Sequence, residues 1–307
     1  MIRAEGLTKR YGSTTAVDSL DFEVVPGVVT GFLGPNGAGK TTTMRLILGL
    51  DSPTSGSVTV NGRNYRDVPY PLHEVGALLD AKALHPSRSA HNHLLALAKS
   101  SRISPSRVDV VLDMVGLSDV ASRPAGKFSL GMGQRLGIAA ALLGDPPILM
   151  FDEPVNGLDP EGILWIRNLL RSLAMEGRTI FLSSHLMSEM AQTADQLIVV
   201  GRGRLIVADS VANVVGGGMG TVRVETPQFR ELATVLGAHG GVVSYDDDVL
   251  EVSGLDSRRV GELALEHRIV IYELVRQRES LEDAYFRLTE SSVDFHGAES
   301  ILAGGAR

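Results

Sequence analysis

The clearest indication of the fold of this chain is Gly34-Pro35-Asn36-Gly37-Ala38-Gly39-Lys40-Thr41. It fits the pattern G-x-x-x-x-G-K-[ST], follows an apolar run at residues 28–33 and precedes a helical pattern at residues 42–50 that includes Thr42. Glycine reaches positive φ, so consecutive N–H groups can surround phosphate oxygens at the positive end of the next helix. Lys40 supplies a charge to the terminal phosphates, and the Thr41 hydroxyl suits Mg²⁺. The stretch therefore predicts a site for a nucleoside triphosphate with Mg²⁺.

Short apolar runs alternate with helical patterns around this stretch, which indicates an α/β fold. The runs at residues 148–151, 179–182 and 197–200 are apolar on both faces, as in buried parallel strands. Residues 163–174 form the pattern of a crossover helix. Residues 86–143 differ, since Val108, Val111, Leu112 and Val115 lie on one helical face and strand signals are few. We expect a helical subdomain inserted there between strands of one sheet.

The glycine cluster at residues 216–218 is typical of a linker and divides the chain. We place one domain at residues 1–220 and a smaller α+β unit at 221–290, with a hairpin whose turn holds Asp246, Asp247 and Asp248. Residues 291–307 are expected to form a disordered tail. Residues 1–220 hold 20 basic and 20 acidic side chains, whereas residues 221–307 hold 9 and 16. The acidic second part argues against nucleic acid as a partner and is typical of a solvated surface.

The composition excludes several kinds of site and segment. The chain of 307 residues has no cysteine, so disulfides, thiolate metal sites and cysteine nucleophiles are excluded. Its first residues carry charges and lack the apolar core of a signal peptide, and no run approaches the roughly 18 apolar residues of a membrane-spanning helix. Taken alone, the chain is expected to be soluble.

Two carboxylates follow the apolar run at residues 148–151. Adjacent strand residues point to opposite sides, so Asp152 and Glu153 can take different roles. We expect Asp152 to hold the metal, directly or through water. Glu153 is expected to orient and deprotonate an attacking water, since phosphoryl transfer depends mainly on positioning and charge stabilisation.

The family is indicated by three further segments. Together with the phosphate-binding stretch, residues 128–135 (FSLGMGQR), 156–159 (NGLD) and 183–185 (SSH) resemble the ATP-binding subunits of ABC transporters, over about residues 2–215. The resemblance implies that the first segment of one subunit covers the ATP of a second copy, with Ser129 and Gly131 facing phosphate. Ser129 also suits the N-cap of a helix running to Leu143.

The same resemblance assigns three further residues. Tyr11 is similar to the aromatic residue that stacks on adenine, where stacking contributes about 1–3 kcal/mol. His185 is similar to the histidine that reaches the γ-phosphate. Asp159 is similar to the residue of the loop that communicates between the two sites.

The chain departs from the usual pattern at a few positions. Asp80 stands where the family usually has glutamine, and the two positions align to within one residue. Aspartate can ligate Mg²⁺, but its side chain is shorter than that of glutamine and is anionic. Leu130 and Met132 replace the commonest glycine and glutamine. With residues 281–286 (LEDAYF), these features resemble the drug-resistance branch of daunorubicin- and bacitracin-type export ATPases. That branch implies a separate integral-membrane permease and a place on the cytoplasmic face of the cell membrane.

The leading hypothesis is therefore an ATP-hydrolysing subunit that powers efflux. One alternative is a soluble ATPase of the same type acting on ribosomes or nucleic acid. It would normally need two cassettes or a long coiled-coil insert, and neither is present. Another is a regulator without turnover, which Glu153 and His185 disfavour.

Overall fold

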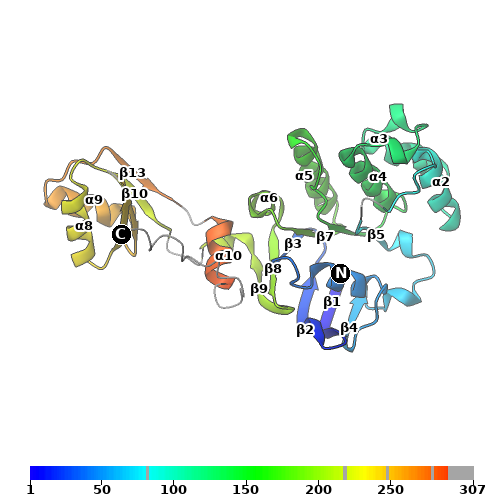
Figure 1. The fold of residues 1–307 in the computed structure, drawn as a ribbon, viewed down its shortest axis with the longest axis horizontal. Helices are drawn as coiled ribbons and strands as arrows, with labels where there is room; N and C mark the ends of the chain where they lie inside the picture. The colour runs from blue at the N-terminus through cyan, green and yellow to red at the C-terminus, as the bar shows by residue number, and fades with distance from the viewer. Residues whose placement is uncertain (81–82, 217–219, 247–248, 278–279, 290–307) are drawn as a thin grey trace, which may run out of the picture. The chain divides into compact units, whose positions relative to one another are not determined.

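The computed structural model describes residues 1–80, 83–216, 220–246, 249–277 and 280–289 (Figure 1). The chain forms two compact units, Met1–Ser210 together with the segment from Leu288, and Val211–Arg287. Helix α7 (Val211–Gly216) falls in the second unit, although the sequence analysis places the boundary after residue 220. The glycines at 217–218, the hairpin turn at 247–248 and the tail at 291–307 lie outside the described residues.

A six-stranded sheet positions the site. Its order is β5-β6-β7-β3-β8-β9, and the first five strands are parallel, as predicted, while β9 is antiparallel to β8. Every residue of β3 and β7 is buried. The strands are β3 (Val29–Leu33), β5 (Val75–Leu78), β6 (Ile148–Asp152), β7 (Thr179–Ser184), β8 (Gln196–Gly201) and β9 (Arg204–Ser210). Parallel strands end at the same edge, so the segments after β3, β6 and β7 meet there.

A second, antiparallel sheet has the order β2-β1-β4 and consists of β1 (Ile2–Tyr11), β2 (Thr14–Val24) and β4 (Ser55–Val60). Its apolar side chains share one core with helix α1 (Lys40–Ile47) and the six-stranded sheet. At its centre the rings of Phe22, Phe32 and Phe181 lie 5.2–6.0 Å apart. Aromatic pairs at such separations stabilise a core beyond the area they bury. Two 3₁₀ turns, Tyr65–Asp67 and Pro71–His73, lead to β5.

The predicted helical insert lies between β5 and β6. It contains α2 (Ala90–Ser100), α3 (Ser106–Met114), α4 (Leu130–Leu142) and the 3₁₀ turns Ser118–Val120 and Ala125–Lys127. The expected apolar face of α3 and its C-cap is buried, with Val108, Val111, Leu112 and Val115 all at most 1% exposed. In Figure 1, α4 and α5 (Pro160–Met175) lie on one face of the six-stranded sheet and the three-stranded sheet lies on the other. Helix α6 (Met187–Thr193) follows β7.

The second unit contains β10 (Val222–Glu225), α8 (Phe229–Ala238), β11 (Val242–Asp246), β12 (Val249–Ser253), α9 (Ser257–Glu266), β13 (Glu273–Arg276) and most of α10 (Leu281–Thr289). Its antiparallel sheet has the order β11-β12-β10-β13, the pattern of a split β-α-β. Alternate strand residues such as Val224 and Leu250 are buried with Leu236 and Leu263 of the helices. The strand expected at 269–275 is shorter and begins later, since only Glu273–Arg276 pairs with β10, and Ile269 joins this core ahead of it.

Candidate functional site

The phosphate-binding loop has the expected strand–turn–helix context. It follows β3, and α1 begins at Lys40 directly after the N-cap residue Gly39. Gly37 and Gly39 have φ of 82° and 97°, a conformation that glycine adopts without strain. The loop is closed by a hydrogen bond of 3.1 Å from the N–H of Ala38 to the carbonyl of Pro35. The backbone is therefore shaped to present N–H groups at a helix N-terminus, which favours an anion.

Lys40 is buried beneath the loop. Lys40 is only 8% exposed, and its Nζ donates to the carbonyls of Gly34 and Pro35 at 2.6 and 3.3 Å. Burial lowers the pKa of Lys40, and the carboxylates of Glu153 and Asp152 oppose that shift. The amine is thus a desolvated positive charge, which interacts strongly with an incoming anion.

A pocket of about 260 Å³ brings the predicted phosphate and carboxylate residues together. Two strands that are distant in sequence supply its sides: Ala16 comes from β2, and Asp152 ends β6. Its lining consists of Ala16, Asn36, Gly37, Gly39, Lys40, Thr41, Thr42, Asp152 and Glu153. The pocket therefore unites seven residues of the predicted nucleotide and metal site with Glu153.

Two oxygen ligands suited to Mg²⁺ converge in this pocket. The Thr41 hydroxyl donates to Oδ2 of Asp152 at 2.6 Å, and the hydroxyl of Ser183 donates to Oδ1 of the same carboxylate. Hydroxyl and carboxylate oxygens match the hard-ligand preference of Mg²⁺, which keeps several waters or phosphate oxygens as its other ligands. The residues fit that ion. Within the described ranges, no group of three or more His, Asp or Glu side chains forms a separate metal cluster.

Glu153 has a strained backbone that its neighbours hold in place. Its φ of 53° is in the left-handed region, where a side chain costs on the order of 1–3 kcal/mol. Its N–H donates to the carbonyl and hydroxyl oxygens of Ser183 at 3.3 and 3.1 Å. Its carbonyl accepts from Nε2 of the buried Gln134 at 3.3 Å, and the carbonyl of Pro154 accepts from the same amide at 2.9 Å. These bonds fix the direction of the Glu153 carboxylate.

That carboxylate contacts the predicted histidine. Nδ1 of His185 lies 2.6 Å from Oε2 of Glu153, and the His185 N–H donates to the same oxygen at 3.4 Å. The imidazole is half exposed, whereas Glu153 is largely covered. Register places both groups at the same sheet edge, because Asp152 and Ser183 are paired across β6 and β7.

Ser129 caps α4, as predicted, and its hydroxyl accepts from the N–H of Met132 at 3.2 Å. The helix is one residue shorter than expected and ends at Leu142. Ser129 lines a pocket different from the one around Lys40, and this second pocket has a volume of about 350 Å³. A Cβ added to Gly131 would lie 3.0 Å from the carbonyl of Gly157, so the segments around residues 131 and 157 approach closely.

Three other predicted residues lie apart from the phosphate pocket. Asp159 caps α5 by accepting from the N–H of Gly162 at 2.9 Å. Tyr11, 48% exposed, donates its hydroxyl to Asp51 at 2.9 Å, and hydrogen bonds from Arg45 and Tyr11 hold the pKa of Asp51 below its ordinary value. Asp80 follows β5, whose end is level with that of β6.

The sequence analysis gives no role to Gln134 or Ser183, although both lie in the motifs that carry the resemblance. Their hydrogen bonds to Glu153 join residues 19 and 30 positions apart in the chain. No local pattern marks such pairs, because the partners meet only when α4, β6 and β7 are assembled.

Comparison with known families agrees with this geometry. Residues 17–156 match a family described as ABC transporter, and residues 220–282 match a domain family of unknown function. The chain resembles the solved dimeric structure of MJ0796, a bacterial ABC transporter cassette, with a TM-score of 0.64 and 26% identity over 69% of this chain and 99% of that one. A post-hydrolysis dimer of the same cassette bound to ADP and Pi matches at a TM-score of 0.63.

Curated relatives match over more of the chain. The bacitracin transport ATP-binding protein BcrA of Bacillus licheniformis is 36% identical over 296 residues, which cover 94% of this chain and 97% of the relative. The lantibiotic transport ATP-binding protein SrtF of Streptococcus pyogenes is 38% identical over 209 residues, 67% of this chain and 90% of the relative. The chain therefore belongs to the family of ABC transporter ATP-binding subunits, which are ATPases, within the branch that includes the bacitracin transport ATP-binding proteins.

Proposed function

We propose that this chain hydrolyses ATP to drive export of a peptide antibiotic, drug or other small molecule through a separate membrane permease. The observation that carries the proposal is the convergence of Lys40, Thr41, Asp152 and Glu153 in one pocket, with His185 bonded to Glu153. The names of the two relatives, one a bacitracin and one a lantibiotic transport protein, support this substrate class.

Each residue has a distinct part in hydrolysis. Loop N–H groups and Lys40 bind the β- and γ-phosphates, and Thr41 and Asp152 hold Mg²⁺, which neutralises charge on the phosphates when bound. Glu153 accepts a proton from the attacking water. His185 orients that carboxylate and reaches the γ-phosphate. Asp80 contributes a further oxygen ligand near the metal, and Tyr11 stacks on the adenine.

A second copy of the chain completes the site. Ser129 lines a pocket separate from that of Lys40, so in this proposal each copy presents Ser129 and Gly131 to the ATP of the other. The N-terminus of α4, which favours a negative charge, then meets the γ-phosphate. The dimeric cassette among the solved relatives supports this arrangement. Asp159, at the start of α5, is the proposed link between the two sites.

Attachment to the permease would place the protein on the cytoplasmic face of the cell membrane. Within the described residues, none of the helices combines the length and apolar character that crossing a bilayer demands. We propose residues 1–220 as the ATP-binding domain with its helical subdomain at about 86–143, and residues 221–290 as an accessory unit. The relatives named above are transport proteins and match along most of their length, so they favour transport over action on ribosomes or nucleic acid.

The test uses the purified full chain and its Glu153→Gln variant with Mg²⁺ and ATP. We expect the variant to bind a fluorescent ATP analogue and to form a dimer, detected by light scattering, that persists because turnover is blocked. The control is Glu251→Gln, at an exposed position of β12 in the second unit. Co-expression with the membrane protein of a neighbouring gene should recover a complex in detergent. Failure to bind ATP and to dimerise would refute the proposal.

A further inference from the structure

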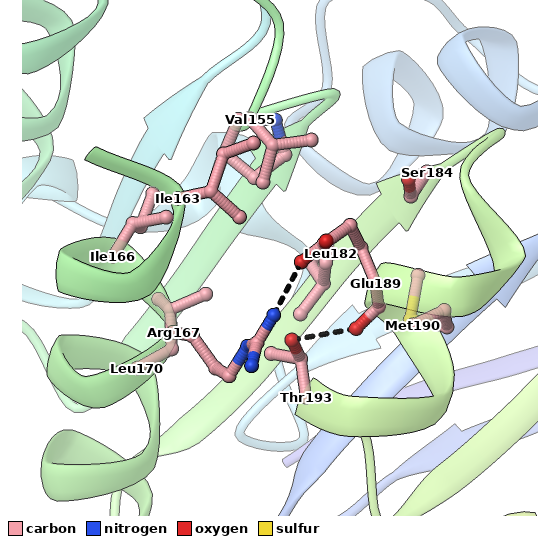
Figure 2. A pocket seen from close by; sticks show the side chains of 11 residues that line it. Val155, Ile163, Ile166, Arg167, Leu170, Leu182, Ser184, Glu189, Met190 and Thr193 are labelled. Atoms are coloured by element: carbon pink, nitrogen blue, oxygen red, sulfur yellow. Dashed lines mark hydrogen bonds and ion pairs between the residues drawn. The ribbon is translucent and has the colours of Figure 1, made fainter. Parts of the chain in front are cut away.

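Two helices that start at the site are joined by a part-buried ion pair. Helix α5 begins after Asp159, and α6 begins two residues after His185. Figure 2 shows Arg167 of α5 extending to Glu189 of α6, where Nη2 and Oε2 lie 2.6 Å apart. Nη1 of Arg167 donates to Oε1 of Gln192 at 2.6 Å. One guanidinium thus bonds two residues on adjacent turns of α6.

The pair lies in apolar surroundings. The side chains of Arg167 and Glu189 are 17% and 23% exposed. Aliphatic residues of three elements surround them, and Figure 2 shows these as Val155, Ile163, Ile166, Leu170, Leu182 and Met190. Nε of Arg167 is buried and makes no hydrogen bond among the described residues. A part-buried guanidinium in this position depends on its anionic partner, because removal of Glu189 leaves the charge of Arg167 uncompensated.

Helix α6 depends on such contacts for its position. It has seven residues, and its N-cap residue Leu186 makes no side-chain capping bond. Helices this short are not stable by their own backbone bonds. Within α6 the Thr193 hydroxyl donates to the Glu189 carbonyl at 2.8 Å, and Met190 packs on β3, where a Cβ on Gly31 would lie 2.3 Å from its sulfur.

His185 lies between the end of β7 and this helix. The Leu186 N–H donates to the Ser184 hydroxyl at 2.9 Å, so the turn that carries the imidazole is short and stiff. A shift of α6 would therefore move Nδ1 away from Oε2 of Glu153, which lies only 2.6 Å away.

We infer that Arg167 is a positioning residue for ATP hydrolysis: by bonding Glu189 and Gln192 it fixes α6, and through α6 it keeps His185 against Glu153. This inference rests on the proposed function, in which His185 acts in hydrolysis. Because α5 starts at Asp159, Arg167 also joins the helix after the communicating loop to the helix after the histidine.

The test compares three variants: Arg167→Met, Arg167→Lys, and a double variant that exchanges the charges by combining Arg167→Glu and Glu189→Arg. We expect Arg167→Met to lower kcat about 10- to 100-fold, as displaced reacting groups do, while KM and the Kd for ATP stay within about twofold. Arg167→Lys and the double variant should each recover part of the lost kcat. Arg171→Met, at an exposed position one turn along α5, should leave kcat unchanged. If Arg167→Met does not fold, Glu189→Gln serves the same comparison.

The decisive measurement repeats Arg167→Met in a His185→Ala background. If Arg167 acts through His185, the second substitution lowers kcat no further. An equal loss in both backgrounds, or an unchanged kcat in the single variant, would overturn the inference. The single His185→Ala variant separates this result from the proposed function: normal turnover there would remove His185 from the mechanism, whatever Arg167 does.

Discussion

The Thr41 hydroxyl donates a hydrogen bond of 2.6 Å to Oδ2 of Asp152, across 111 residues of sequence. This bond brings the start of α1 against the end of β6, so the phosphate-binding loop and the hydrolytic carboxylates form one pocket. Its two oxygens are also the proposed protein ligands of Mg²⁺.

Asp152→Asn should weaken the response to Mg²⁺ while the fold persists, because the amide loses the charge but keeps one oxygen that can accept from either Thr41 or Ser183. We expect kcat to fall at least about tenfold and the Mg²⁺ concentration for half-maximal rate to rise. Phosphate release across a Mg²⁺ titration measures both quantities. An unchanged titration curve would exclude Asp152 as a ligand.

Glu153→Gln should retain ATP binding and lose about 10²- to 10⁴-fold in turnover, the usual contribution of a general base. Single-turnover hydrolysis and equilibrium binding measure the two properties separately. Normal turnover in this variant would remove Glu153 from the chemistry.

Gln134→Leu should lower both stability and kcat. It removes the amide that donates to the carbonyls of Glu153 and Pro154 and leaves them without that partner in a covered position. We expect a loss of about 1–3 kcal/mol in the free energy of unfolding, measured with urea, and a lower kcat. A stable variant with full turnover would show that Ser183 alone holds the backbone of Glu153.

Lys40→Met should weaken ATP binding about 10- to 100-fold, because a charge-assisted bond to phosphate is lost. Without nucleotide it should instead be more stable than the natural protein at neutral pH, since burial lowers the pKa of Lys40 from 10.5.

That gain should depend on pH. With a lowered pKa in the fold, the unfolded chain binds more protons between the two pKa values, so the stability of the natural protein rises with pH through that window. The advantage of Lys40→Met should therefore shrink as pH approaches 10.5. Urea unfolding at several pH values measures it, and a growing advantage would contradict the assignment.

Gly76→Ala should destabilise the first unit, because a Cβ there would lie 1.9 Å from the carbonyl of Ala141 in α4. Backbone cannot yield as a side chain can, so we expect a cost of about 1–3 kcal/mol. Gly237→Ala in α8 is the matched control, since nothing lies within 4 Å of its added Cβ. It should stabilise the second unit by about 0.4–1 kcal/mol. Unfolding followed separately for each unit tests both.

The local parts of this protein could be predicted from the amino-acid sequence. The glycine-rich turn between β3 and α1, the acidic end of β6, the cap at Ser129 and the buried face around Val111 depend on residues near one another in the chain. Their spacing expresses backbone geometry and helical periodicity, so each could be predicted with its element.

Which of these parts come into contact depends on the assembled fold. It placed β3 between β7 and β8, set Gln134 and Ser183 on the strained backbone of Glu153, and joined Arg167 to Glu189. Such contacts arise from packing and strand order, where residues far apart in sequence become neighbours. A glutamine, a serine or an arginine has no local signal for its distant partner, because the partner is chosen by the assembled fold.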